Sequence, residues 1–257
     1  MYEIEMHEMT PAFHACWLAA GNHLNRQVDG GIQSWLRADP YPPFLEHLSF
    51  RLGNQLFFVR LADVDGEVKG PGNPRGAISA ARMANGIACE LPMKRSRSGA
   101  WAANLPGWGL IDGHTGQPLN PAALVTDEKI EMTAWELQDV AVQIVRDDLT
   151  KAGFKLNSWQ SNPEIDPSLW FVGESGGPEW VVVRTVTYPV PRATIPANWE
   201  AIAANVARIS KLGHFASVSL VSAEQLNAPE DAPRIPLWRG HGLHAIYEGL
   251  ERVSHQI

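Results

Sequence analysis

The sequence predicts an α+β fold, organised as a tandem pseudo-repeat of an α-β-β-β-α-β module. Two observations predict it. Capped helical segments and short strand-like runs follow nearly the same order in both halves, and short strings of residues recur 123 to 130 positions apart. Agreement between element order and recurring strings favours a duplication over two coincident patterns. We therefore expect two modules, residues 1–125 and residues 126–257.

In the first half, Thr10-Pro11 combines a candidate N-cap with a proline at the first helical position, which predicts a helix. Gly53-Asn54 is typical of a hairpin turn, and Asn73-Pro74 predicts a second helix that ends near Gly86. Residues 96–125 are rich in Gly, Pro, Asn and Trp, so we expect a tail and a link to the second module. The expected strands are residues 48–52, 56–64 and 87–91.

The second half begins with the clearest element of the chain, a helix over residues 133–152. Thr133 and Glu136 form a capping box, Gly153 ends the helix, and apolar residues recur at helical spacing between them. A second helix is expected over residues 197–212. The expected strands are residues 155–159, 169–172, 180–188 and 215–221.

The recurring strings support the duplication because their offset only grows along the chain, as small insertions would make it. The alternative is chance, since the identities are few. The matched strings are Glu8-Met9-Thr10 with Glu131-Met132-Thr133, Phe58-Val59-Arg60 with Val182-Val183-Arg184, Gly86-Ile87-Ala88 with His214-Phe215-Ala216, and Leu105-Pro-Gly-Trp108 with Ile235-Pro-Leu-Trp238.

The composition excludes several classes of protein. The net charge is -7, and it divides into -3 and -4 over the two halves, so no basic face favours nucleic-acid binding. The acidic N-terminus lacks a signal-peptide core, and no apolar run is long enough to span a membrane. Cys16 and Cys89 are too few for a disulfide framework. We expect a cytoplasmic protein that does not bind membranes.

Residues 173–178, Gly-Glu-Ser-Gly-Gly-Pro, resemble the nucleophile motif of chymotrypsin-like serine proteases and also fit the Gly-x-Ser-x-Gly pattern of α/β-hydrolases. That resemblance implies a serine hydrolase with Ser175 as its nucleophile. However, strand-like segments on both sides, together with glycines and a proline, are typical of a hairpin turn. The turn is the favoured interpretation, and acyl hydrolysis at Ser175 is the alternative.

The element order is similar to the core of the restriction-endonuclease-like superfamily. That resemblance implies an acid on the second strand and a Glu-x-Lys motif on the third, which hold a divalent metal beside a phosphate. Asp166 precedes the second strand, but Val182-Val183-Arg184 stands where Glu-x-Lys is expected. We therefore expect a nuclease-like scaffold without nuclease chemistry, a pseudoenzyme. The alternative is a metal-dependent phosphodiester hydrolase that uses Asp166 and a displaced acid, Glu179.

His241 and His244 are three residues apart near the C-terminus and could ligate a transition metal. The favoured interpretation is ordinary hydrogen bonding, because the spacing lacks the pattern of known zinc motifs. We expect no cofactor, and a divalent metal is the alternative.

The leading function is that of a binding or protein-interaction module with no complete catalytic set. Arg60 and Arg184 end apolar strands at equivalent places, where they could bind a carboxylate or phosphate. Trp108 and Trp238 lie in loops, where tryptophan favours interaction surfaces. The partner class is a protein or a small acidic ligand, and the sequence specifies no oligomeric state.

Overall fold

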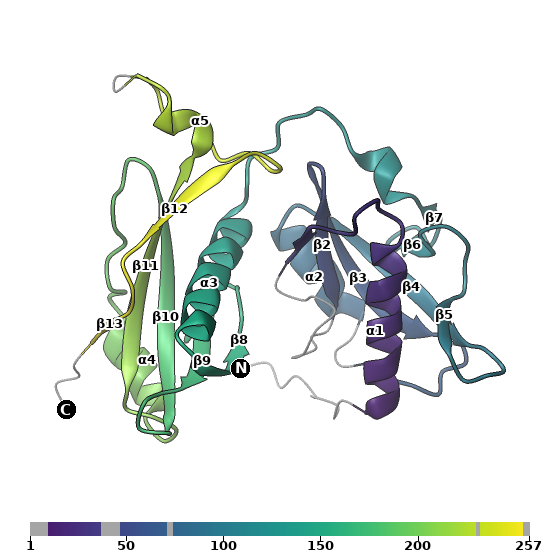
Figure 1. Cartoon of the computed structure of the whole chain (residues 1–257), viewed down its shortest axis with the longest axis horizontal. Helices are drawn as coiled ribbons and strands as arrows, with labels where there is room; N and C mark the ends of the chain where they lie inside the picture. Colours follow the sequence, from purple (N-terminus) through teal and green to yellow (C-terminus); the bar gives the residue numbers. More distant parts are fainter. Residues whose placement is uncertain (1–9, 37–46, 71–73, 230–231, 254–257) are drawn as a thin grey trace. The chain divides into compact units, whose positions relative to one another are not determined.

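The computed structural model of the protein describes residues 10–36, 47–70, 74–229 and 232–253. The described residues form two sheets, of seven and six strands, and five α-helices, so the α+β class is confirmed. The chain divides into two compact units, Met1–Lys129 and Ile130–Ile257 (Figure 1). This division lies four residues after the predicted module boundary. Glu8, Met9 and Asn73 lie outside the described residues.

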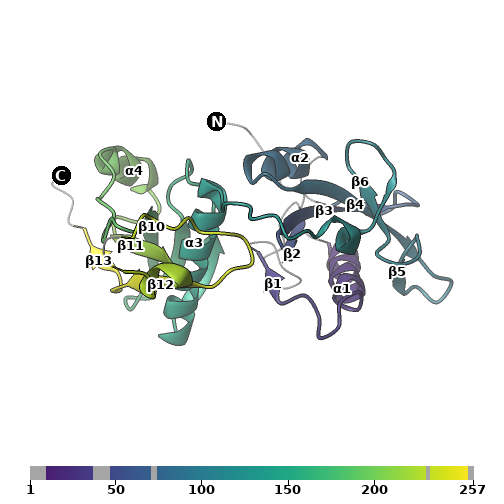
Figure 2. The same ribbon diagram turned by 90° about the horizontal axis from the view of Figure 1, so that it is seen from above.

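The first unit is built around a parallel pair of strands, β3 and β4, to which the other strands add in antiparallel fashion. The strand order is β1-β2-β3-β4-β6-β7, and β5 also pairs with β4. Figure 2 shows α1 and α2 on opposite sides of this sheet. The elements are α1 (Pro11–Asn25), β1 (Ser34–Trp35), β2 (Leu48–Leu52), β3 (Gln55–Asp63), α2 (Pro74–Met83), β4 (Ile87–Arg95), β5 (Trp101–Ala103), β6 (Leu110–Asp112), β7 (Pro118–Leu119) and the short 3₁₀-helix η1 (Pro121–Leu124).

Local sequence signals account for the start of α1 and for the hairpin. The Thr10 hydroxyl accepts a hydrogen bond from the Phe13 N–H at 3.1 Å, as an N-cap should. Gly53 has a φ of 56° and is the first of the two residues that join β2 to β3, the position at which a type II′ turn needs glycine.

Residues 96–125 were predicted as a tail and link without strands, and the structure corrects that prediction in three places. It contains β5, β6 and β7, which extend the sheet of the first unit, and β4 itself runs on to Arg95. The strands are only two or three residues long, too short to show the alternation of apolar and polar residues that marks a strand in sequence.

The core of the first unit lies between α1 and the sheet. Its fully buried side chains include Trp17 and Leu24 of α1 and Phe57 of β3. Both cysteines of the chain belong to the same cluster. Burial raises the pKa of Cys16 to about 12, with Asp63 adding to the effect and Arg95 opposing it. Burial, aided by Asp112, raises the pKa of Cys89 to about 12.

We expect both thiols to be unreactive in the folded protein. The pKa values are raised above the ordinary 9.0, so burial of the protonated thiols stabilises the fold below pH 9, and this contribution is lost as the pH rises toward 12. An Ellman's assay at pH 8 should find no reacting thiol in the native protein and two in urea. A thiol that reacts without unfolding would contradict the burial of Cys16 or Cys89.

The second unit has the same kind of centre, a parallel pair formed by β10 and β11, with antiparallel strands on both sides. The strand order is β12-β11-β10-β9-β8, and β13 also pairs with β11. The elements are α3 (Ala134–Lys151), β8 (Lys155–Trp159), β9 (Leu169–Val172), β10 (Pro178–Thr187), α4 (Trp199–Val206), β11 (Gly213–Ser222), α5 (Ala223–Leu226), β12 (Leu243–Tyr247) and β13 (Glu251–Arg252).

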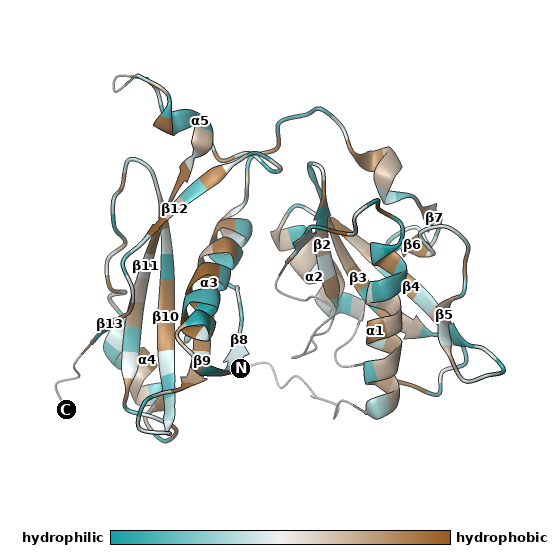
Figure 3. Ribbon diagram, in the orientation of Figure 1, coloured by the Kyte–Doolittle hydropathy of each residue, from teal (hydrophilic) through white to brown (hydrophobic). Residues whose placement is uncertain are grey.

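Helices α3 and α4 cover opposite faces of this sheet (Figure 2). Residues of β10 alternate between them: Val181 and Val183 pack in the cluster that contains α3, whereas Trp180 and Val182 pack in the cluster that contains α4. Figure 3 shows the resulting hydrophobic segment along the middle of β10. Being buried on both faces explains why this strand is continuously apolar.

The two helices follow their sequence signals to different extents. The predicted capping box of Thr133 and Glu136 is present, and α3 ends at Lys151, one residue before the predicted end. The observed helix α4 covers only Trp199–Val206 and is therefore shorter than the predicted helix over residues 197–212. Beyond it the Ser210 hydroxyl accepts a hydrogen bond from the Leu212 N–H at 3.0 Å, and this local side-chain bond turns the chain toward β11.

Both units place their core elements in the same order, with a helix, three antiparallel strands, a second helix and a parallel fourth strand. The first unit uses α1, β1 to β3, α2 and β4, and the second uses α3, β8 to β10, α4 and β11. A shared topology alone does not show a shared origin, so the duplication stays a prediction. Within the described ranges, no helix has the length and apolar character needed to cross a membrane.

Candidate functional site

The candidate site lies where β10 outgrows its neighbour β9. Strand β10 has ten residues and pairs with β11 as far as Thr187, but its pairing with the four-residue β9 ends at Val181. Ser168, just before β9, continues the pairing for one step. Its N–H donates to the Val181 carbonyl at 2.8 Å, and its hydroxyl accepts from the Val183 N–H at 3.2 Å. Beyond Val183, no strand of the described residues pairs with this side of β10.

A glutamine of α3 takes the place of the missing strand at Val183. The Gln138 amide donates to the Val183 carbonyl at 3.0 Å and accepts from the Thr185 hydroxyl at 3.0 Å. Its side chain is buried, so both bonds are needed to offset the loss of water. Gln138 was not predicted as a site residue, although the sequence carries a signal: Gln138 lies on the same helical stripe as Val142 and Val145, where an apolar residue is the default.

The arginine that was predicted to bind a ligand is held by an acid of the same unit. Both nitrogens at the end of Arg184 donate to Asp166, with distances of 2.9 Å to Oδ1 and 2.5 Å to Oδ2. Nη1 of Arg184 also donates to the Val183 carbonyl at 3.0 Å. Such a bidentate pair fixes the guanidinium plane. The exposed fractions are 24% for Arg184 and 10% for Asp166, so part of the arginine still faces solvent.

These elements enclose a groove, which we call the β10 groove. Its volume is about 430 Å³, within the roughly 300–1,000 Å³ that is usual for ligand sites. Apolar side chains make up more than half of its lining, and the polar ones come mainly from β10. The lining residues are Ala134, Leu137, Gln138, Pro163, Arg184, Thr185, Val186, Thr187 and Val190.

Glu179, the other acid of the predicted metal pair, lies at the opposite end of β10. Its Oε2 is 2.6 Å from Nε2 of His214, and each side chain is 13% exposed. Asp166 binds Arg184, five residues further along the strand, which corresponds to about 16 Å. The structure therefore does not bring Asp166 and Glu179 together. Sequence reasoning missed His214, whose pairing with Glu179 depends on the register of β10 with β11.

The two predicted histidine ligands have separate surroundings. His241 lies 3.1 Å from Glu224 through Nδ1, and His244 is exposed on β12 opposite Val221. In the part of the chain that the structure describes, no group of three or more His, Cys, Asp or Glu residues could hold a metal ion.

Ser175 lies in the turn between β9 and β10, where its side chain is exposed. Residues 173–177 connect the strands, and the Gly173 N–H donates to the Gly177 carbonyl at 2.9 Å, so the favoured turn interpretation is confirmed. Among the described residues no histidine donates to or accepts from Ser175.

A serine without a base is a weak nucleophile. We therefore expect a fluorophosphonate probe to leave Ser175 unlabelled, as measured by mass spectrometry of the intact protein beside a known serine hydrolase. A stoichiometric adduct that disappears in Ser175→Ala would support the hydrolase alternative instead.

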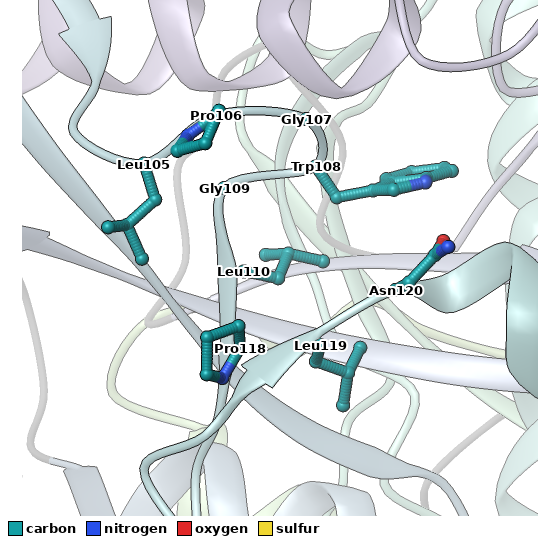
Figure 4. Close-up of a pocket in the computed structure, with 9 residues that line it drawn as sticks. All are labelled: Leu105, Pro106, Gly107, Trp108, Gly109, Leu110, Pro118, Leu119 and Asn120. Atoms are coloured by element: carbon teal, nitrogen blue, oxygen red, sulfur yellow. The ribbon is translucent and has the colours of Figure 1, made fainter.

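The binding candidates of the first unit also have local partners. Nη1 of Arg60 on β3 lies 2.8 Å from Oε2 of Glu90 on β4, the residue opposite it in the parallel register. The Trp108 ring stacks on the Phe50 ring, with 6.1 Å between the two centroids. The main-chain carbonyl of Trp108 lies 3.0 Å from Nε2 of His23. Trp108 lines a cavity of about 330 Å³ formed by residues 105–110 and 118–120 (Figure 4). This cavity is largely apolar and has no charged lining residue.

Trp238 belongs to the second unit and supports its fold rather than the β10 groove. It is half-buried, and its main chain forms an isolated antiparallel bridge with Glu131. The bridge places the next residue, Arg239, beside the start of α3, where its guanidinium reaches Glu136. Arg184 is therefore the one predicted binding residue that lines the β10 groove.

A family described as a domain of unknown function (DUF8840) matches residues 135–253. The match runs from α3 to β13 and includes every lining residue of the β10 groove except Ala134. Comparisons with curated proteins and with solved structures find no match.

Proposed function

We propose that the second unit is a binding module whose ligand lies in the β10 groove. The observation that carries this proposal is the meeting of an apolar cavity with a small set of fixed polar groups, Gln138, Arg184 and Thr185. Ligand sites typically have this composition, with apolar walls for affinity and a few oriented polar groups for specificity. Gln138 and Thr185 hold each other, and Asp166 holds Arg184, before any ligand arrives, which lowers the entropic cost of binding.

Binding is favoured over catalysis because the described lining contains no nucleophile beside a base. The Thr185 hydroxyl is already donated to Gln138, and the charge of Arg184 is balanced by Asp166. That pairing also argues against an isolated small anion as the ligand, since Asp166 already occupies the bidentate face of the guanidinium.

Ligand-observed NMR with a library of uncharged fragments tests this proposal. We expect hits whose binding disappears in Val190→Trp, because the larger ring fills the groove from an exposed position. Val64→Trp in the first unit is the matched control, since the two valines are 47% and 48% exposed. Hits that bind equally well to the wild type and to Val190→Trp would place the ligand elsewhere and overturn the proposal.

A further inference from the structure

We infer that the ligand of the β10 groove is an extended polypeptide segment that pairs with β10 as an added strand. This inference rests on the proposed function and names the class of ligand. It follows from the main chain of β10, where most of the groups on the side of the groove beyond Val183 have no partner among the described residues.

The direction of each main-chain group along β10 follows from printed hydrogen bonds at both ends of the strand. The N–H groups of Trp180 and Tyr188 donate to the Leu212 and Leu220 carbonyls, at 3.1 and 3.0 Å. Even-numbered residues therefore face β11. Val183 faces the other way, because its N–H donates to Ser168 and its carbonyl accepts from Gln138. Main-chain groups alternate in direction along a strand, so Thr185 and Thr187 also face away from β11.

Three of the four outward groups of these threonines have no hydrogen bond to any described residue. The Thr187 carbonyl accepts from the Val190 N–H at 3.1 Å. The Thr185 N–H, the Thr185 carbonyl and the Thr187 N–H have no such partner within the described ranges. They form a donor, an acceptor and a second donor along the wall of the groove. Unpaired groups of this kind on a sheet edge are a template for another strand.

The geometry of the groove favours a polypeptide as the ligand rather than a small molecule. Outward residues repeat about every 6.6 Å along a strand, and an extended chain offers its own N–H and carbonyl groups at that repeat. Helix α3 supplies Ala134 and Leu137 beside the strand. A peptide held between a strand edge and a helix is a recurring mode of recognition, with main-chain bonds for affinity and pockets for alternate side chains.

The charges and ends of the groove define the segment further. Asp166 balances Arg184, so the groove favours an uncharged segment with apolar residues at alternate positions. Gln138 and Arg184 occupy the Val183 carbonyl and close one end of the open edge. The paired stretch is therefore short, about three to five residues.

The test uses capped, uncharged pentapeptides with apolar residues at alternate positions, screened as an array against the full chain. Peptides that bind should lose affinity for Val190→Trp but not for Val64→Trp. In the best binder, N-methylation at alternate residues should weaken binding more than tenfold, because those N–H groups face β10, and N-methylation at the residues between should have little effect. Equal effects at all positions, or binding that survives in Val190→Trp, would overturn strand addition.

Two measurements on the protein itself complete the test. Thr187→Pro removes a donor that the fold does not use, so the variant should keep its circular dichroism spectrum and lose peptide binding more than tenfold. If that variant does not fold, hydrogen exchange of the wild type decides: the Thr185 and Thr187 amides should exchange quickly in the free protein and become protected by the peptide. Amides whose exchange the bound peptide does not slow would contradict the inference.

The outcomes separate the two proposals. Fragments that are blocked by Val190→Trp, with no pentapeptide binding at the groove, would overturn strand addition and leave the binding function standing. If neither fragments nor peptides depend on Val190→Trp, both proposals are wrong.

Discussion

Replacing Arg239 with alanine is expected to lower the free energy of unfolding of the second unit by about 3–5 kcal/mol, the usual cost of leaving a buried charge unpaired. The Arg239 side chain is fully buried and Glu136 is 4% exposed. Two bonds join them, Nε to Oε1 at 2.8 Å and Nη2 to Oε2 at 2.9 Å. The same carboxylate accepts from the N–H and hydroxyl of Thr133 at the N-terminus of α3.

Urea denaturation followed by circular dichroism measures this effect, and two further variants control it. The double variant Glu136→Gln with Arg239→Met should recover most of the loss, because glutamine keeps the capping bond and no charge stays buried. Arg192→Ala should cost less than about 1 kcal/mol, since its partners Glu248 and Glu251 are exposed. A loss below about 1 kcal/mol for Arg239→Ala would contradict the structural role of the pair.

The second large effect is expected for Trp180→Ala, at about 3–5 kcal/mol of unfolding free energy. The Trp180 ring is fully buried between β10 and α4, with its centroid 5.0 Å from that of Trp199. Its indole N–H donates to the Ser210 carbonyl at 3.3 Å, so truncation leaves both a cavity and an unpaired carbonyl.

Trp180→Phe helps to separate these contributions, because it keeps an aromatic ring in the core but has no N–H donor and leaves a smaller cavity than alanine does. We expect it to cost well under half of the alanine value in the same urea titration. Equal losses for the two variants would mean that the packing against Trp199 contributes little. Circular dichroism should follow this titration rather than tryptophan emission. The chain has ten tryptophans, so its emission does not report on the surroundings of Trp180 alone.

Much of the fold was predictable where local signals are strong. The capping box of Thr133 specifies the start of α3, and Gly53-Asn54 specifies the register of its hairpin, because both depend on residues close in sequence. The strands of residues 96–125 and the end of α4 were not predictable in this way. The strands depend on pairing with β4 and β6, which are tertiary contacts, and the end of α4 is followed by the hydrogen bond of Ser210.

The candidate site was predictable only in part. Arg184 was predicted as a binding residue because it ends an apolar strand, and it does line the β10 groove. Asp166 was proposed as a metal ligand, yet it serves as the partner of Arg184, 18 residues away. The unpaired edge at Thr185 and Thr187 follows from the unequal lengths of β9 and β10, and no local pattern in the sequence reports how far a neighbouring strand will pair.

The position of the two cysteines gives the protein an internal reporter. Cys16 and Cys89 lie in one cluster of the first unit, and the described part of the second unit contains no cysteine. The reactivity of the thiols therefore reports the unfolding of the first unit alone, whereas the circular dichroism signal is the sum of the contributions of both units. Each unit has its own hydrophobic clusters, so a single midpoint need not describe the whole chain. Comparing the two signals in one titration separates the transitions without adding a label.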